Sequence, residues 1–385
     1  MKILNCIRNE KFFNSMMEIF EKEKGTHIIE YAVISDDEGD LSHIKLRDKV
    51  RHIAPCDFID YLERKKVNVV IAHNLRSIPN ELIAEIPSGV LVVWFGWGFD
   101  MYSWPDSVSP LIKLKNQILP ETQKAVRAID PLYRFRQYHA YLNNVIRGNK
   151  FKTIINRFDY FAGVFPLEFG LLQKKSFFRA KQLIFNYGCS GDDYKKENVS
   201  EFTIPQGKDI LIGNSADPNN NHLDVFEQIR GLDLTDRKII VPLSYGGHQQ
   251  YKEQVKKRGK EIWGDNFMPL DNFMPLTEYK QLIDSCGFVI MGHVRQQASE
   301  NIEINLWNGR KVFLYASSIG FKHYSELGFS LCKLEELNKT ELNKPLLKDQ
   351  ILANRRIMVA YNSAEANVAN FHKIIATLEK EVRDR

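Results

Sequence analysis

The stretch from Phe267 to Leu314 constrains the fold of this chain more than any other. It reads FMPLDNFMPLTEYKQLIDSCGFVIMGHVRQQASENIEINLWNGRKVFL and predicts a loop, a helix, an apolar strand, a polar turn, a second helix and a second strand. The run Phe288 to Met291 is typical of a strand buried on both faces. Ala298, Ile302 and Leu306 recur at the helical spacing and give the second helix its core stripe. The stretch therefore predicts a βαβ unit with parallel strands.

The turn from His293 to Gln297 lies where the first of these strands passes into the second helix. Backbone N–H groups, the positive helix end and the guanidinium of Arg295 can converge there on one anion, as a diphosphate requires. A surface ion pair is the alternative role of Arg295. Glu300 and Glu303 lie three residues apart on the following helix, where either could accept ribose hydroxyls or simply face solvent.

Length and composition indicate two domains in a reducing compartment. The chain has 385 residues, of which 44% are hydrophobic, and this is enough to form two hydrophobic cores. Its five cysteines are odd in number and widely spaced, without a CxxC pair, so they predict neither a disulfide framework nor a zinc site. The opening apolar run is too short for a signal peptide, and eighteen consecutive apolar residues occur nowhere. We therefore expect a cytoplasmic protein without a membrane span.

Strand and helix patterns alternate throughout, which predicts an α/β fold. The first half also carries a long helical insertion, from Gln117 to Arg147, interrupted by prolines. A polar segment around 188–208, rich in glycine, proline and charge, is the best linker. We expect an N-terminal domain over 1–190, a linker over 191–208, a second domain over 209–345 and C-terminal helices over 346–385 that pack back on the first domain.

The second half opens with a strand that runs into a small-residue turn, Gly213-Asn214-Ser215, and then a helix from His222. Small residues let backbone approach a ligand, and the Asn or Ser side chain can cap the helix or donate to phosphate. An ordinary β-to-α connection is the alternative, and His222 is either a capping-turn histidine or a phosphate donor. A second such turn, with Tyr245 and Gly246, follows the next strand. Together with the Arg295 turn, these turns lie at the carboxyl ends of parallel strands, where open α/β sheets bind ligands.

In the first half, the strand that ends at Trp94-Phe95 continues as Gly96-Trp97-Gly98-Phe99-Asp100-Met101-Tyr102. Trp97 and Tyr102 can stack on sugar faces, and Asp100 can act as a base toward an acceptor hydroxyl, although a turn-capping aspartate is the commoner explanation. His73 and Asn74 follow another strand and are predicted to face the same acceptor site.

Two segments interleave basic and aromatic residues. The first holds Lys150, Phe151, Lys152 and Phe158, and the second Lys174, Lys175, Phe177, Phe178 and Arg179. Both suit docking on an anionic membrane surface, with solvated helices as the alternative. No DNA- or RNA-binding motif accompanies them, so nucleic acid is not a predicted partner.

Several motifs carry a family resemblance: GNSADPNNNHLD, VPLSYGG, FMPLDNFMPLTEY and RQQASENI in the second half, and WFGWGFDMY in the first. From about Val69 to Leu334 the chain resembles the bacterial TDP-acetamidofucose:lipid II transferases, also called 4-alpha-L-fucosyltransferases. The resemblance implies the GT-B architecture, two Rossmann-like domains facing a central cleft, with the nucleotide-sugar donor on the second domain and the acceptor on the first.

By that resemblance, the donor diphosphate and sugar contact Gly213, Asn214, Ser215, Arg295, Gln296 and Gln297. Phe273 and Met274 would hold the nucleobase, with core packing as their alternative role. One position departs from the family, since Glu300 stands where a small residue such as glycine is expected.

The expected enzyme moves a deoxyamino sugar, acetamidofucose-like, from a TDP donor to a polyprenyl-diphosphate-linked saccharide of the enterobacterial common antigen or O-antigen type. It would work at the cytoplasmic leaflet of the inner membrane. No DxD motif stands at a strand end, so neither a metal nor another cofactor is predicted, and Asp192-Asp193 lies in the linker. A nucleotide-sugar epimerase of the same fold and a non-catalytic nucleotide-sugar-binding regulator are the alternatives.

Overall fold

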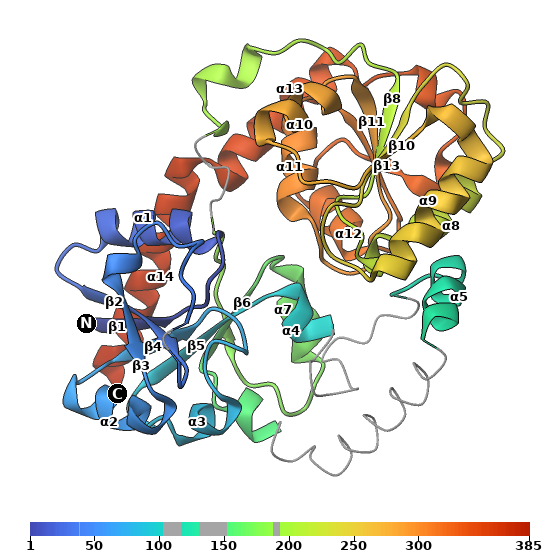
Figure 1. Ribbon diagram of the computed structural model, residues 1–385. Helices are drawn as coiled ribbons and strands as arrows, with labels where there is room; N and C mark the ends of the chain where they lie inside the picture. The colour runs from blue at the N-terminus through green and yellow to red at the C-terminus, as the bar shows by residue number, and fades with distance from the viewer. Residues whose placement is uncertain (38, 103–116, 131–151, 188–192) are drawn as a thin grey trace. The chain divides into compact units, whose positions relative to one another are not determined.

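The computed structural model describes residues 1–37, 39–102, 117–130, 152–187 and 193–385. They form two α/β units (Figure 1). The first contains the described residues of Met1–Lys113, Tyr138–Asp193 and Asn362–Arg385, and the second those of Leu114–Gln137 and Tyr194–Tyr361. Residues 117–130, placed in the first domain by the sequence, therefore belong to the second unit. Of the C-terminal helices, residues 362–385 belong to the first unit and residues 346–361 to the second.

Each unit is built on a sheet whose paired strands are all parallel. Within the described residues, the first sheet has the order β3-β2-β1-β4-β5-β6-β7. Its strands are β1 (Lys2–Cys6), β2 (Ile28–Ile34), β3 (Val50–Ile53), β4 (Val69–Ala72), β5 (Leu91–Gly96), β6 (Tyr160–Gly163) and β7 (Lys181–Gln182). Every residue of β4, β5 and β6 is buried, as expected when helices cover both faces of a parallel sheet.

The helices of the first unit are α1 (Phe13–Glu23), α2 (Phe58–Arg64), α3 (Asn80–Glu85), α4 (Gly98–Tyr102), α7 (Leu167–Gln173) and α14 (Ala364–Asp384). Helices α1 and α14 pack together on one face of the sheet (Figure 1). Phe20 of α1 meets Phe371 of α14 with ring centroids 4.7 Å apart. Helix α14 thus adds to the core of the first unit although it comes last in the chain.

In the second unit, the described strands are ordered β10-β9-β8-β11-β12-β13, and all of their pairings are parallel. They are β8 (Asp209–Ile212), β9 (Ile239–Pro242), β10 (Phe267–Leu270), β11 (Cys286–Met291), β12 (Lys311–Leu314) and β13 (Cys332–Lys333). The helices are α5 (Pro120–Ile129), α8 (His222–Ile229), α9 (Gln249–Trp263), α10 (Leu276–Ile283), α11 (Ser299–Trp307), α12 (Ile319–Glu326) and α13 (Lys348–Asn362). The predicted α/β architecture with two Rossmann-like units is confirmed.

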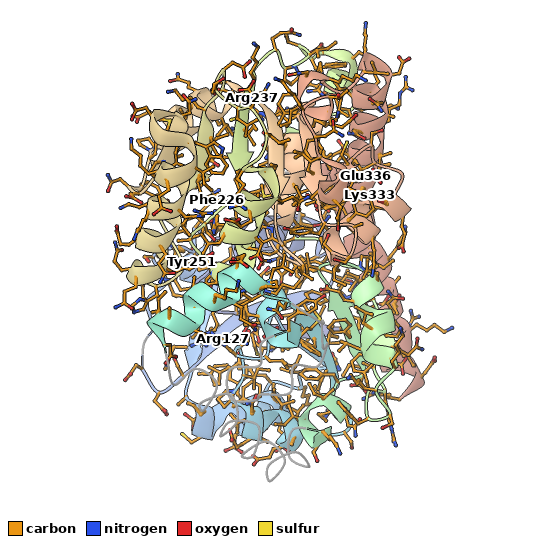
Figure 2. All side chains as sticks on the ribbon, turned by 90° about the vertical axis from the view of Figure 1, so that its right-hand side faces the viewer. Arg127, Phe226, Arg237, Tyr251, Lys333 and Glu336 are labelled. Carbon is orange, nitrogen blue, oxygen red and sulfur yellow. The ribbon has the colours of Figure 1, made fainter. Side chains whose placement is uncertain are left out.

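Helices α8 and α9 cover one face of the second sheet. Phe226 of α8 and Tyr251 of α9 are fully buried in that core (Figure 2). Helix α5, which comes from the first half of the sequence, packs on both helices. The carboxylate of Asp224 accepts hydrogen bonds from the backbone N–H groups of Glu121 and Thr122, each at 2.9 Å, and so caps α5.

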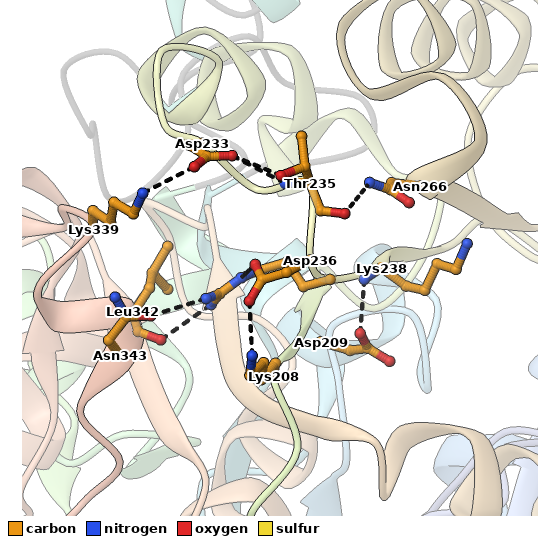
Figure 3. A network of polar contacts seen from close by, with 11 residues as sticks. Lys208, Asp209, Asp233, Thr235, Asp236, Lys238, Asn266, Lys339, Leu342 and Asn343 are labelled. Carbon is orange, nitrogen blue, oxygen red and sulfur yellow. Dashed lines mark hydrogen bonds and ion pairs between the residues drawn. The ribbon is translucent and has the colours of Figure 1, made fainter.

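A polar network joins the amino ends of the strands in the second unit (Figure 3). The buried guanidinium of Arg237 donates to the carbonyl of Leu342 at 3.0 Å and to the side-chain oxygen of Asn343 at 3.1 Å. Asp236 beside it pairs with Lys208 at 2.9 Å. This network lies at the edge of the sheet opposite to the turns predicted to bind the donor.

In both sheets the strand order reverses once, between β1 and β4 and between β8 and β11. Loops leave the carboxyl ends of the two strands in opposite directions at such a point, which opens a crevice where α/β proteins bind ligands. In the second unit the Gly213 turn and the Arg295 turn flank this reversal point.

Two predictions about local structure were wrong. Phe267–Leu270, predicted as a loop, is the edge strand β10, where a proline is tolerated because its missing N–H faces no neighbouring strand. Phe158 and Phe178, predicted to contact lipid, are buried. Phe158 packs on Trp94 and Phe178 on Phe161.

The cations of those segments are partly exposed. Lys152, Lys174 and Arg179 are exposed, whereas Phe151 and Lys150 lie outside the described residues. No helix in the described part of the chain is long and apolar enough to cross a membrane.

Candidate functional site

The three turns predicted to bind a donor adjoin one another in the second unit. Gly213 follows β8 with φ +71°, and a Cβ atom there would lie 2.7 Å from the side-chain oxygen of Asn220, so glycine is required. The amide of Asn221 donates to the carbonyl of Gly292 at 2.8 Å and so joins this turn to the one after β11. The backbone N–H of Ala216 donates to the carbonyl of Tyr245 at 2.8 Å, which joins it to the turn after β9.

Two buried histidines lie at this junction. The Nδ1 atom of His222 is 3.2 Å from the hydroxyl of Tyr251, while its Nε2 atom has no hydrogen-bond partner among the described residues. Both ring nitrogens of His293 lack a partner in the same part of the chain. Burial lowers the pKa of His222 to about 4 and that of His293 to about 3, where the charge of Arg295 adds to the effect. Both rings are therefore neutral at pH 7, each with one donor and one acceptor nitrogen.

Other polar atoms around the turns are also unsatisfied. Within the described residues, the side-chain oxygens of Asn214 and Gln297 are buried without a partner. Asn214 uses its amide to donate to the hydroxyl of Tyr245 at 3.0 Å, and Ser215 is buried beside it and accepts a hydrogen bond from Asn220. Buried polar groups are normally paired, so this concentration of unpaired atoms makes the three turns the candidate ligand site.

Arg295 lies over its own turn, where its Nη1 atom donates to the carbonyl of the buried Gln296 at 2.9 Å. Helix α11 begins four residues later, after Ala298, whose φ of +56° is unusual for a residue with a side chain. The turn thus presents a guanidinium together with the amino end of a helix, and both attract an anion.

The two glutamates of α11 have different environments. Glu303 is buried and accepts a hydrogen bond from the hydroxyl of Tyr324 at 3.1 Å, so the solvated-face alternative is wrong for this residue. Glu300 is part-exposed in the first turn of the helix. Burial raises the pKa of Tyr245, and the nearby negative charges of Glu300 and Asp217 raise it further. Glu300 therefore lies near the second turn, and a ribose contact from either glutamate stays a prediction.

Phe273 and Met274 lie in the loop between β10 and α10. Phe273 is 89% exposed, so the core-packing alternative is wrong for it, whereas Met274 is half-buried. Tyr245 is 57% exposed as well. Exposed aromatic rings of this kind are suited to stacking on a planar base.

In the first unit, Asp100 is fully buried and closes the turn after β5. Its carboxylate accepts hydrogen bonds from the backbone N–H of Leu75 and Trp97 and from the indole N–H of Trp94, at 3.2, 3.0 and 3.3 Å. Burial raises the pKa of Asp100 to about 7, against the effect of these donors. The geometry supports the turn-capping role, and a role as catalytic base stays a prediction.

Two of the predicted acceptor residues, His73 and Trp97, belong to one hydrogen-bond network. His73 is fully buried, with Nε2 at 2.9 Å from the side-chain oxygen of Asn5 and Nδ1 at 3.1 Å from the hydroxyl of Tyr187. The indole of Trp97 donates to that same hydroxyl at 2.9 Å. Both nitrogens of His73 are thus occupied within the fold, and its ring positions the half-buried Trp97 beside it.

Asn74 and Tyr102 are also buried. Asn74 accepts a hydrogen bond from the backbone of Arg76 at 2.9 Å, and Tyr102 donates to the buried carboxylate of Glu168 at 2.8 Å. Contact of either residue with an acceptor stays a prediction.

Sequence reasoning missed the residues that hold the donor turns together, namely Asn220, Asn221, Tyr251 and the imidazole of His293. The run Pro218-Asn219-Asn220-Asn221 was a usable signal for the first two, because consecutive asparagines cap turns with their side chains. Tyr251 gave no such signal, since its contact with His222 spans 29 residues.

Solved structures share this architecture along the whole chain. The lipopolysaccharide outer core galactosyltransferase WaaB in its apo form is similar with a TM-score of 0.63 and 10% identity, covering 98% of this chain and 99% of that one. A glycosyltransferase from Rickettsia africae gives 0.62 with 12% identity, and 98% of both chains is covered. Anabaena HepE in complex with UDP-glucose gives 0.58 with 11% identity, covering 98% of this chain and 100% of that one.

The fold is that of the GT-B glycosyltransferases, and the protein is a glycosyltransferase. Residues 169–306 match the family model described as 4-alpha-L-fucosyltransferase, glycosyl transferase group 56. The matched segment contains all three turns together with Arg295, Glu300 and Glu303.

Proposed function

We propose that this glycosyltransferase moves a deoxyamino sugar of the acetamidofucose type from a TDP-sugar donor to a polyprenyl-diphosphate-linked saccharide in surface-polysaccharide synthesis. The observation that carries the donor assignment is the cluster of buried, unpaired polar atoms where the turns after β8, β9 and β11 adjoin. The match to the 4-alpha-L-fucosyltransferase family supports the class of sugar. The motif resemblance supports the TDP nucleotide and the lipid-linked acceptor.

The reaction exchanges one bond at the anomeric carbon of the donor sugar. An acceptor hydroxyl oxygen attacks this carbon, the bond from the carbon to the diphosphate oxygen breaks, and its electron pair leaves with the nucleoside diphosphate. The acceptor hydroxyl gives up its proton, which passes to a base or to solvent water. Negative charge therefore grows on the diphosphate, and stabilising that charge is the main task of the donor site.

Three features would meet this charge. Arg295 supplies a fixed positive charge, and the amino end of α11 adds its dipole. The neutral rings of His222 and His293 each offer an N–H donor from a buried position where a hydrogen bond is not weakened by water. We assign the nucleobase to Phe273 and Tyr245, whose exposed rings provide stacking surfaces.

A polyprenyl tail would hold the acceptor in the membrane, so the enzyme would dock on the cytoplasmic leaflet. The exposed cations Lys152, Lys174 and Arg179 support this docking. Because Phe158 and Phe178 are core residues, the attraction we propose is mainly electrostatic and sensitive to salt.

The test is an assay of donor consumption with and without a lipid-linked saccharide acceptor. A transferase releases TDP only when acceptor is present, with Arg295→Ala as the inactive control. Conversion of the donor to an isomer without acceptor would establish an epimerase instead. Tight donor binding with no turnover under either condition would establish a regulatory binding protein.

A further inference from the structure

A cavity lies in the first unit, at the point where the strand order reverses between β1 and β4. Its volume is about 210 Å³, and the loops after β1, β2 and β4 form its walls. Sites for whole drug-sized ligands occupy roughly 300–1,000 Å³, so this cavity fits one charged group and its nearest neighbours. None of the residues predicted to contact the acceptor lines it.

Two arginines line this cavity from different loops, Arg8 after β1 and Arg76 after β4. Both are exposed, and neither guanidinium makes an ion pair or a hydrogen bond with any residue that the structure describes. The guanidinium of Arg76 lies 4.7 Å from the ring centre of Phe99, which holds it in place. Arginine pairs are suited to forked contacts with phosphate or carboxylate oxygens.

The cavity also contains a buried hydroxyl. The Oγ atom of Ser77 has no hydrogen-bond partner in the described part of the chain, and the residue is only 2% exposed. A buried hydroxyl that lines the cavity can form a hydrogen bond with a ligand bound there.

The acidic residues of the cavity are differently engaged. The carboxylate of Asp40 accepts hydrogen bonds from the amide of Asn9 and from the backbone N–H of Ser42, both at 2.8 Å, so it orders the loop. Asp37 is exposed and lines the same cavity. A carboxylate beside two arginines can accept the hydroxyls of a sugar whose charged group the arginines bind.

We propose that Arg8, Arg76 and Ser77 form a subsite for an anionic group of the saccharide acceptor, either its diphosphate or a sugar carboxylate. The proposal rests on the acceptor class proposed above, and it adds the group that is recognised and the residues that recognise it. The subsite is built wholly from residues of the first unit, whereas the donor turns belong to the second.

The experiment is a calorimetric titration of the full chain with two probes, inorganic pyrophosphate and a hexuronic acid. The variant is Arg8→Gln/Arg76→Gln, and the matched control is Arg47→Gln/Arg64→Gln, which removes two other exposed arginines of the same unit. Any pyrophosphate site in the second unit contributes equally to all three proteins, so differences between them report on the cavity. We expect at least one probe to bind tenfold or more weakly to the cavity variant and within twofold of wild type to the control.

The identity of the affected probe tells diphosphate from carboxylate. Equal binding of both probes to wild type and to the cavity variant, or no binding of either to wild type, would overturn the subsite. Titrating TDP into the same proteins keeps this result distinct from the function proposed above. Unchanged TDP affinity in the cavity variant is expected, while a wild type that binds no TDP would count against the donor site alone.

Discussion

The side-chain amide of Asn221 donates to the backbone carbonyl of Gly292 at 2.8 Å, across the point where the second sheet reverses its strand order. Contact at this point is close, because a Cβ atom on Gly292 would lie 2.3 Å from the carbonyl oxygen of Asn220. The turn after β8 and the turn after β11 are therefore fixed to each other before any donor arrives. Preorganisation of this kind reduces the free-energy cost of binding.

Replacement of Arg295 by alanine should weaken TDP binding by about 1.5–3 kcal/mol, the range of a hydrogen bond to a charged group. Titration calorimetry on wild type and variant measures this difference. Arg230→Ala is the control, since Arg230 belongs to the same unit and pairs with Glu227 on the exposed side of α8. Equal TDP affinity in the Arg295 variant would remove this residue from the site.

Gly213→Ala should damage both stability and nucleotide binding. A side chain at φ +71° costs about 1–2 kcal/mol, and its Cβ would also press on Asn220 and on the Nε2 atom of His222, 3.0 Å away. We expect tenfold weaker TDP binding in this variant. Gly231→Ala is matched to it, because nothing lies within 4 Å of a Cβ there. Similar TDP affinities in the two alanine variants would show that the β8 turn does not touch the donor.

The buried histidines should make the protein lose stability in weak acid. The folded pKa values, about 4 for His222 and about 3 for His293, lie below the ordinary value near 6.5, so the unfolded chain binds more protons. Stability is then complete above pH 6.5 and falls below it, by up to about 1.4 kcal/mol per pH unit for each ring.

Urea unfolding at pH 7, 6 and 5 tests this. The double variant His222→Gln/His293→Gln should lose the contributions of these two rings, together up to about 2.8 kcal/mol per pH unit. His73 and His323, which are buried in the same way, keep theirs, and Asp100, whose raised pKa acts in the opposite direction, keeps its own. The exposed His43→Gln variant should keep the full slope. A double variant with the slope of wild type would mean that water already reaches both rings.

Asp100→Asn should lower the free energy of unfolding and leave the chemistry intact. An amide cannot accept with its nitrogen, so one of the donors from Leu75, Trp94 and Trp97 is left unsatisfied at a cost of about 1–3 kcal/mol. Turnover per folded molecule should stay within a few-fold. A loss of roughly 10²-fold or more in a folded variant would instead identify Asp100 as the base.

Charge reversal of Lys152, Lys174 and Arg179 to glutamate should release the protein from anionic vesicles. Each cation near an anionic leaflet contributes about 1 kcal/mol, so the triple variant loses at least three such terms. Co-sedimentation at low salt measures the effect, and reversal of Lys257, Lys280 and Lys322 in the other unit is the control. Docking through these cations would be contradicted if the wild type does not sediment with anionic vesicles, or if the triple variant still sediments fully.

The limits of prediction are clearest in the tetrapeptide Phe-Met-Pro-Leu, which occurs twice within ten residues. At 267–270 it is the edge strand β10, with Phe267 packed on Phe226 and Trp263. At 273–276 it is a loop that enters α10, with Phe273 exposed. Identical local sequences adopt different structures here because long-range packing on α8 and α9 selects one of them.

The buried strands and the glycine-marked turns were predictable because their signals are local. Val289 and its neighbours form an apolar run, and Gly213 stands where only glycine fits. The hydrogen bond between His73 and Tyr187 could not be predicted, because 114 residues separate the two side chains and neither is unusual in its own segment. The burial of Phe178 could not be predicted either, because it depends on the contact with Phe161, which belongs to another element.

The attachment of α5 to α8 also has a consequence for how the chain folds during synthesis. Glu121 leaves the ribosome 103 residues before Asp224, which caps it. At about 5–20 residues per second the helix waits roughly 5–20 s for its partner. Throughout that interval Ala125, which is buried in the finished protein, has nothing from the second unit to cover it. The nascent first half must therefore carry an amphipathic helix with an uncovered apolar face through its own folding, a stage at which a chaperone has a defined surface to shield.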